Sequence, residues 1–427
     1  MSALIIFALL TFLMLSGMPV SISLGLTVLT FLFAFTSTPL EAVALKLFTG
    51  IEKFEIMAIP FFILAGNFLT HGGVAKRMIY FATSMVGHLR GGLGLSAVFA
   101  CALFAAVSGS SPATVVAIGS ILLPAMVRAG YPKKFGVGVI ASSGGLGILI
   151  PPSIVMVMYA VSTNSSIGAL FMAGVVPGLL LALFLGFTTW YQAKKGNYPR
   201  EEPLSWAQRW DAFRKAIWGL LLIVVVMGGI YSGLFTPTEA AAMSAVYAFF
   251  IAVFVYKDLG MKDVPRVLLN SANMSAMLLY IITNAVLFSF ILTNEQIPQG
   301  IADWLTHSGV GMVGFLIAVN ILLLVMGSFM EPSSIILITA PILFPIATKL
   351  GIDPIHFGVM ITVNMEIGMI TPPVGLNLYV ASGVAKMGLT DCSKAVWPWL
   401  FTMLAYLMVI TYVPAISTWL PKTLGMM

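Results

Sequence analysis

Long apolar runs separated by short polar segments dominate this chain. Ala3–Ser16, Val20–Phe35, Leu170–Tyr191 and Leu268–Leu292 are examples. An apolar run of about 20 residues can cross a bilayer as a helix. A membrane β-barrel would instead show alternating segments of about 10 residues, and no such pattern occurs here. The pattern therefore predicts an all-α, polytopic membrane protein.

The remaining spans follow from the same pattern. We predict them at Ile56–Leu69, Phe135–Val161, Trp218–Phe235, Glu239–Tyr256, His356–Val384 and Trp397–Leu420. The first 15 residues are apolar from the start, without a basic segment or a small-residue cleavage site. We therefore expect a first membrane span there rather than a signal peptide.

Two kinds of interruption recur in both halves of the chain. First, short apolar arms flank a small-residue break: Leu93–Val107 with Ala113–Val127, and Val313–Val325 with Ile335–Ala347. Arms this short predict re-entrant helical hairpins. Second, a Gly-rich segment ending in two prolines interrupts each following span, at 144–152 and 366–373. These predict two broken helices, because lipid cannot satisfy backbone that leaves a helix.

The two halves share an ordered set of anchors around these interruptions. Leu123-Pro124, Gly130 and Phe135-Gly136-Val137 correspond to Phe344-Pro345, Gly351 and Phe357-Gly358-Val359. Paired interruptions at matching places indicate the binding site of a secondary transporter built from internal repeats.

Charge supports an inverted orientation of the two halves. Charged residues make up 8% of the chain, against about 25% in soluble domains. The formal net charge of +6 does not indicate nucleic-acid binding, since the basic residues lie in short loops. With inverted-topology repeats, all but four of the 21 Lys and Arg residues lie on the cytoplasmic side; the exceptions are Lys46, Lys53, Lys349 and Lys422. Within the basic connection Gln192–Lys215, Leu204–Trp218 is either an amphipathic helix in the membrane interface or a solvated linker.

The breaks carry the candidate chemistry. Proline suits the first position of a helix, so Pro112, Pro152, Pro332 and Pro373 are each expected to open a half-helix. Four helix N-termini converging within the membrane would attract an anion without a buried Lys or Arg. The candidates for substrate contact are Ser110, Ser111, Asn164, Glu331, Ser333, Asn364 and Asn377. Glu331 could instead cap its own helix.

Carbonyls released at the breaks, together with hydroxyl groups, suit a small hard cation such as Na⁺. We expect one cation site in each half, between a hairpin tip and a double-proline break. The candidate cation ligands are Ser108, Gly109, Ser111, Gly145, Ile148 and Pro151, and in the second half Gly327, Met330, Gly368, Met369 and Thr371. These glycines could instead serve only close helix packing.

Five motifs together resemble a known family. They are Ser108–Pro112, Gly147–Ser153, Gly233–Glu239, Phe329–Pro332 and Thr371–Gly375. In this combination the chain resembles the large membrane subunit of TRAP transporters, the tripartite ATP-independent periplasmic carriers. Gly233–Glu239 could help to dock the delivery protein or could be a turn capped by Thr236 and Glu239.

The resemblance implies the following expectations. The chain would import an organic acid, of the sialic acid or C4-dicarboxylate type, across the bacterial inner membrane, driven by Na⁺. Its partners would be a small four-helix membrane subunit and a periplasmic substrate-binding protein. As an elevator-type carrier it would have scaffold spans and an arm at 1–92, transport repeat 1 at 93–191, the amphipathic arm and further scaffold spans at 192–292, and transport repeat 2 with the last span at 293–427.

Other functions remain as alternatives. A proton-coupled carboxylate exchanger would use Glu331 or Glu366. An intramembrane enzyme would need a nucleophile–base pair or metal cluster at membrane depth, and the sequence suggests neither. Paired breaks favour a binding site over the open pore of a channel. We therefore expect a transporter and no enzyme activity.

Overall fold

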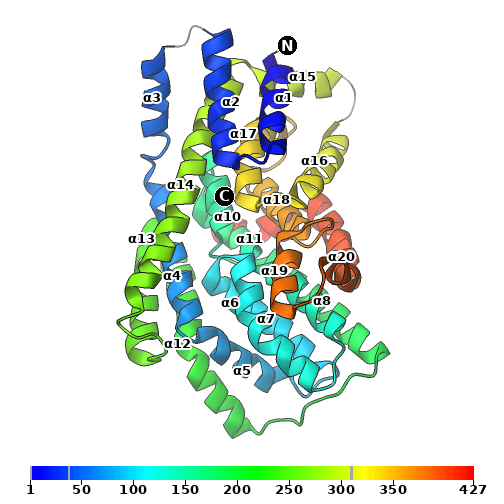
Figure 1. Cartoon of the computed structure of the whole chain (residues 1–427). Helices are drawn as coiled ribbons and strands as arrows, with labels where there is room; N and C mark the ends of the chain where they lie inside the picture. Colours follow the sequence, from blue (N-terminus) through cyan, green and yellow to red (C-terminus); the bar gives the residue numbers. More distant parts are fainter. Residues whose placement is uncertain (1, 37–38, 308–310) are drawn as a thin grey trace.

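The computed structural model describes residues 2–36, 39–307 and 311–427, and every regular element in these ranges is helical (Figure 1). The first half contains α1 (Ser2–Leu15), α2 (Val20–Phe35), α3 (Leu40–Thr49), η1 (Phe54–Met57), α4 (Ala58–His71), α5 (Val74–Val86), α6 (Gly92–Ser108), α7 (Ser111–Arg128), α8 (Lys133–Gly144), α9 (Leu146–Leu149), α10 (Ile154–Thr163) and α11 (Ile167–Lys195).

The second half continues with a similar alternation of long and short helices. It contains α12 (Trp206–Tyr231), α13 (Pro237–Phe250), η2 (Ile251–Val255), α14 (Val264–Asn294), α15 (Ile297–His307), α16 (Gly311–Gly327), α17 (Pro332–Lys349), α18 (Pro354–Gly368), α19 (Leu376–Ala385), α20 (Leu389–Tyr412) and α21 (Ala415–Thr423).

The structure confirms the polytopic helical class. Within the described ranges, eight helices are long and apolar enough to cross a bilayer. A ninth candidate is the pair formed by Lys133–Leu149 and Ile154–Thr163, which bends by 41° at the first double proline. α7 and α17 have 18 residues each and are among the eight, so the predicted arms were too short in both cases. Length alone therefore does not make either hairpin re-entrant.

The helices form two groups (Figure 1). α3, α4, α13 and α14 line one side, where α4 packs closely against α13 and α14 packs against α2, α3 and α4. The hairpins α6–α7 and α16–α17 and the interrupted helices lie on the other side. The hairpins contact the first group mainly through α4 with α6 and α14 with α17.

α12 corrects one predicted boundary. Leu204–Trp218 and Trp218–Phe235 were predicted as an interfacial segment followed by a span. The structure instead has one continuous 26-residue helix from Trp206 to Tyr231. Ser205 and Gln208 close its N-terminus in a capping box, which satisfies two backbone N–H groups. The sequence changes from charged to apolar at Trp218, but the backbone remains helical through that residue.

The apolar pattern also missed three short helices. α3, α5 and α15 have 10, 13 and 11 residues, too few to register as spans. α20 begins at Leu389, eight residues before the predicted start, and the following α21 is separate.

The capped turn predicted at Thr236 and Glu239 is confirmed. The Glu239 carboxylate accepts from the Thr236 backbone N–H at 2.8 Å, and the Thr236 hydroxyl accepts from the Glu239 N–H at 3.3 Å.

Candidate functional site: two hairpin tips against two helix breaks

The first hairpin turns at Gly109 and Ser110, within the predicted break. Gly109 has a φ of +60°, a left-handed conformation that glycine adopts without a Cβ penalty. The Ser108 and Thr114 hydroxyls are 2.9 Å apart, and Thr114 donates to the Ser110 carbonyl at 2.9 Å. These bonds hold the tip as a compact polar turn at the start of α7.

This tip packs directly on the first double-proline break. A Cβ added at Gly109 would lie 2.9 Å from the Pro152 carbonyl oxygen, and one at Gly147 would lie 2.7 Å from the Ser110 carbonyl oxygen. α9 contacts both α6 and α7, which brings Gly145, Ile148 and the Ser108–Ser111 turn into one region. Gly145, Ile148 and the turn are therefore brought together by close backbone contacts at two glycines, whereas the predicted ligand Pro151 also lines an apolar cavity.

The second tip meets the second break in the same manner. A Cβ at Gly327 would lie 2.9 Å from the Gly368 Cα, so the two backbones are in contact. The Gly375 N–H donates to the Ser328 carbonyl at 2.9 Å and joins the hairpin to the far side of the break. Gly327, Gly368 and the Met369–Thr371 segment thus come together as predicted, with Met330 just after the tip.

Sequence analysis missed Gly375, whose lack of a side chain leaves space in front of two carbonyl oxygens. Its φ is +55°, and a Cβ there would lie 2.8 Å from the Met369 carbonyl oxygen and 3.1 Å from that of Thr371. Two carbonyls therefore converge on a position without a side chain. No group of three or more His, Cys, Asp or Glu that could hold a metal occurs in the described ranges. A cation at these breaks would need backbone carbonyls and hydroxyls.

Asn377 and Ser111 connect the two halves of the site. The Asn377 side-chain amide donates to the Ser111 hydroxyl at 2.6 Å and to the Ala141 carbonyl at 3.4 Å. Both residues are fully buried, and the Asn377 Oδ1 has no hydrogen-bond partner in the described structure. Buried polar atoms are normally hydrogen-bonded, so this oxygen is available to accept from a ligand. The predicted substrate residues Ser110, Ser111 and Asn377 thus lie in one place.

The structure corrects two of the four predicted half-helix starts. Pro112 and Pro332 lie in the first turn of α7 and α17, as predicted. Pro152 and Pro373 do not open a helix: α10 starts at Ile154 and α19 at Leu376. Both double prolines contain a cis peptide bond and lie in bends outside the helices. At the first break Ser153 is the actual N-cap and accepts from the Met156 N–H at 3.3 Å.

Glu366 is a buried acidic residue whose side chain lies beside the first break. It is 0% exposed, and both carboxylate oxygens lack a hydrogen-bond partner in the described structure. Its side chain fills the space beside Gly145, where an added Cβ would lie 2.6 Å from Oε1. A buried carboxyl without a partner cannot carry an uncompensated charge at low cost. It therefore requires a proton or a nearby cation.

Glu331 has the capping role. It is exposed, and it accepts from the Ser334 N–H at 3.2 Å and from the Ser333 hydroxyl at 2.7 Å. This arrangement closes the N-terminus of α17, and the carboxylate also favours the positive end of the helix dipole. Glu331 and Ser333 therefore bond to each other and to the start of α17.

Two predicted asparagines bond to other residues, although the buried Oδ1 of Asn364, like that of Asn377, has no hydrogen-bond partner in the described structure. Asn364 donates to the Asn320 carbonyl at 3.0 Å and to the Asn320 Oδ1 at 2.8 Å within a buried network. Asn164 ends α10, about 15 Å along the helix from Ile154 at 1.5 Å per residue. There it accepts a hydrogen bond from Lys53 at 2.5 Å. The structure does not bring either residue to the turn that holds Ser111 and Asn377.

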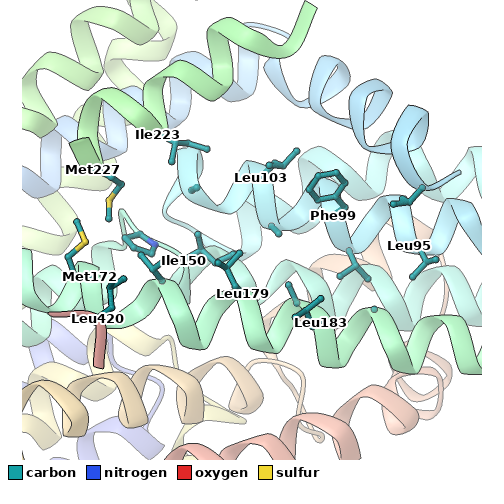
Figure 2. Close-up of a pocket in the computed structure, with 18 of the residues that line it drawn as sticks. Leu95, Phe99, Leu103, Ile150, Met172, Leu179, Leu183, Ile223, Met227 and Leu420 are labelled. Atoms are coloured by element: carbon teal, nitrogen blue, oxygen red, sulfur yellow. The ribbon is translucent and has the colours of Figure 1, made fainter. Parts of the chain in front are cut away.

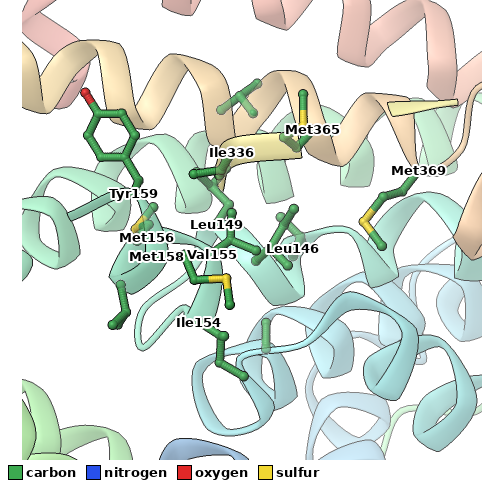
Figure 3. Close-up of a cluster of buried hydrophobic side chains, with 14 of the residues drawn as sticks. Leu146, Leu149, Ile154, Val155, Met156, Met158, Tyr159, Ile336, Met365 and Met369 are labelled. Carbon is green, nitrogen blue, oxygen red and sulfur yellow. The ribbon is translucent and has the colours of Figure 1, made fainter. Parts of the chain in front are cut away.

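Apolar packing fixes the position of the first break. Figure 3 shows Leu146, Leu149, Val155 and Met156 among side chains from the second half, including Ile336 and Met365. The side chains of Leu146, Leu149 and Met156 are fully buried. Close packing of this kind makes a one-methylene change costly. Apolar packing therefore fixes the backbone at the break, where the Ile148 carbonyl accepts from the Ser153 hydroxyl at 2.5 Å.

A large cavity beside the first hairpin has a different character. It has a volume of about 1090 Å³ and is lined by apolar side chains of α6, α11 and α12, such as Phe99, Leu179 and Met227 (Figure 2). It offers almost no hydrogen-bonding groups, which a carboxylate would require. A groove of this composition suits hydrocarbon rather than a charged substrate.

The fold and these paired breaks define a membrane carrier whose polar groups meet at interrupted helices. A family described as "Tripartite ATP-independent periplasmic transporter, DctM component" matches residues 7–416. The chain belongs to this family. It is thus a permease component of a transporter and not an enzyme.

Individual relatives agree with this assignment. The chain is 72% identical to the C4-dicarboxylate TRAP transporter large permease protein DctM of Rhodobacter capsulatus, with 100% of both chains covered. It is 37% identical to the sialic acid TRAP transporter large permease protein SiaM of Vibrio cholerae, with 96% of both covered. The crystal structure of the Alcanivorax borkumensis YdaH transporter has a TM-score of 0.63 at 17% identity, covering 88% of this chain and 89% of that one. This last likeness concerns the fold alone.

Proposed function

We propose that this chain is the membrane permease of a Na⁺-coupled, binding-protein-dependent importer of a C4-dicarboxylate. One observation carries the proposal: each hairpin tip contacts a double-proline break, and Asn377 joins the two groups through Ser111. Carbonyls for cations and hydroxyl and amide groups for a carboxylate are therefore adjacent. Adjacent sites for ion and substrate are what a symporter requires, since their occupancy must be coupled.

The transport mechanism is proposed to be of the elevator type with inverted-topology repeats and re-entrant hairpins. Reciprocal packing supports the repeats: α10 of the first half packs on α17, and α19 of the second half packs on α7. The scaffold would consist of 1–92 and 192–292, and the transport domain of 93–191 and 293–427. In this arrangement the tips and breaks would move together as one body.

Na⁺ would bind at the two tip–break contacts. In the first half Ser108, Gly109, Ser111 and Gly145 would supply carbonyl and hydroxyl oxygens, and in the second half Gly327, Met369 and Thr371 would do so. The space that Gly375 leaves before two carbonyl oxygens supports the second site. Hard cations prefer such oxygen ligands. A bound Na⁺ would offset the negative ends of the nearby carbonyl dipoles. It would therefore favour binding of the substrate carboxylate.

A C4-dicarboxylate is favoured over sialic acid as the substrate. The relative named for C4-dicarboxylate is 72% identical to this chain, whereas the relative named for sialic acid is 37% identical. Ser110, Ser111 and Asn377 would contact the carboxylates. A small four-helix membrane subunit and a periplasmic substrate-binding protein would complete the carrier in the bacterial inner membrane.

Uptake in reconstituted vesicles tests this proposal. The chain and its small subunit are placed in vesicles, and labelled succinate is supplied on the periplasmic binding protein. We expect a Na⁺ gradient to drive uptake at fixed pH, unlabelled succinate to compete and sialic acid to compete weakly. Full uptake without the binding protein, or indifference to Na⁺, would contradict the proposal.

A proton-coupled exchanger is the second candidate, and the burial of Glu366 favours it. Glu331 is less suited, because it is exposed and caps α17. This alternative predicts that a pH gradient alone drives uptake and that Glu366→Gln abolishes it. Under the main proposal, a pH gradient without Na⁺ gives no uptake.

A further inference from the structure

A polar pocket lies where the proposed scaffold meets the proposed transport domain. It has a volume of about 260 Å³ and is lined by Lys46 and Lys53 together with Thr49, Ser162, Asn164 and Ser289. α3 and α14 contribute from the scaffold side, and α10 and α17 from the transport side. The packing is close, since a Cβ at Gly50 would lie 3.0 Å from the Val286 side chain. The pocket is thus separate from the hairpin tips.

Neither lysine of this pocket is held in an ion pair by the residues that the structure describes. Within the described ranges neither Lys46 nor Lys53 has an acidic side chain within 4.0 Å. Lys53 donates to the Val161 carbonyl at 3.1 Å and to Asn164 at 2.5 Å. The Lys46 amine lies 5.3 Å from the centre of the Phe290 ring. An ammonium group has three donors, so Lys53 retains one and Lys46 retains all three for a ligand.

The position of these lysines on the chain is also unusual. Basic residues are depleted on the external side of membrane proteins. Lys46 and Lys53 are two of the four basic residues assigned to that side, and both line this pocket. Lys349, a third, is instead paired with Asp303. The two lysines therefore meet in one pocket without the ion pair that would explain them structurally.

We propose that this pocket is an external binding site for a dicarboxylate, distinct from the transported-substrate site at the tips. Each ammonium group meets one carboxylate, and the Thr49 and Ser289 hydroxyls add donors. Charge-assisted hydrogen bonds of this kind are the strong ones. The pocket receives the anion before it reaches the breaks. The inference rests on the proposed function, because it assigns the substrate class of that carrier to a second site.

Lysine protection tests the site directly. The purified chain, in detergent free of anionic lipid and of Na⁺, is treated with an acetylating reagent, and acetylation of each lysine is quantified by mass spectrometry. We expect succinate to slow acetylation of Lys46 and Lys53 severalfold and to leave Lys422 unchanged. Uncharged succinamide gives no protection. Equal rates with and without succinate would overturn the proposal, as would protection by added phosphatidylglycerol but not by succinate.

Matched variants separate direct from indirect protection. Lys46→Gln is expected to weaken protection of Lys53 about tenfold, the effect of one lost charge-assisted hydrogen bond. Lys422→Gln, on the same predicted side, leaves it intact. Asn377→Leu at the tips also leaves it intact; loss of protection in that variant would mean that succinate acts from the tip site and would overturn the proposal.

Uptake kinetics then distinguish this inference from the proposed function. With succinate delivered to the reconstituted carrier, Lys46→Gln is expected to raise KM about tenfold with little change in the maximal rate. An unchanged KM contradicts the pocket while the importer proposal stands. Absence of Na⁺-driven uptake by the unaltered carrier contradicts the importer instead, and protection of the lysines remains a separate measurement.

Discussion

At the scale of single residues, glycine determines how closely the tips approach the breaks. Gly109, Gly147, Gly327 and Gly368 each lie where a Cβ would come within 3.0 Å of backbone atoms across the contact. Backbone carbonyls can converge on a cation only when no side chain separates the two segments. The small residues at these positions therefore serve the site as well as helix packing.

Gly327→Val tests this requirement. Because the Gly368 Cα occupies the space of the new side chain, the tip must move, at a cost of about 1–3 kcal/mol. We expect Na⁺-driven uptake to fall roughly tenfold while the chain still folds. Uptake at several Na⁺ concentrations and elution from a sizing column measure the two effects.

Gly383→Ala is the control for that variant. Gly383 lies on α19, also in the proposed transport domain, and nothing lies within 4 Å of the Cβ position. This variant is expected to transport normally. If Gly327→Val keeps the same Na⁺ response as Gly383→Ala, the second tip–break contact is not a cation site.

At the scale of elements, helix ends depend on local capping more than on prolines. α10 and α19 start after Ser153 and Gly375 rather than at the second proline of each pair. The serine after Pro152 is a good N-cap residue and could have indicated the later start. No comparable cap residue marks Gly375, which has a positive φ and donates its N–H to the Ser328 carbonyl of the other segment. Hence the breaks were predictable, but their outer boundaries were only partly so.

Trp218→Pro tests the continuity of α12. In one helix from Trp206 to Tyr231, residue 218 is interior, and proline there costs about 3 kcal/mol relative to alanine. We expect Trp218→Pro to unfold at clearly lower denaturant concentration than Trp218→Ala. If a separate span began at Trp218, proline would be tolerated in its first turn and the two variants would unfold alike.

At the scale of the whole molecule, packing between the halves creates the site. Asn377 and Ser111 are 266 positions apart in sequence, and Lys53 and Asn164 are 111 apart. The first pair lies within the proposed transport domain, whereas the second joins scaffold to transport domain. An elevator motion would preserve the first contact and break the second.

Crosslinking tests that distinction. Lys53→Cys with Asn164→Cys, joined by a short reducible thiol crosslinker, is expected to arrest uptake, and reduction is expected to restore it to the level of the uncrosslinked double variant. The control pair is Thr188→Cys with Thr402→Cys on α11 and α20, whose hydroxyls are 2.8 Å apart. Both control positions belong to the proposed transport domain, so their crosslink should leave uptake unchanged. Equal uptake with the first pair crosslinked would exclude relative motion at this contact.

The sequence by itself determined the helical membrane class and the location of both tips and both breaks. It could do so because apolar run length, glycine and proline act locally on the backbone. It also indicated Ser111 and Asn377 as polar groups at the breaks, although not that they bond to each other.

Only the tertiary structure decided which of those polar groups meet. It placed Asn164 beside Lys53, assigned Glu331 to a helix cap and left Glu366 buried without a partner. It also joined the predicted amphipathic segment and span into α12. These outcomes depend on contacts between residues far apart in the chain, and hydrophobic periodicity carries no information about which distant faces will pack together.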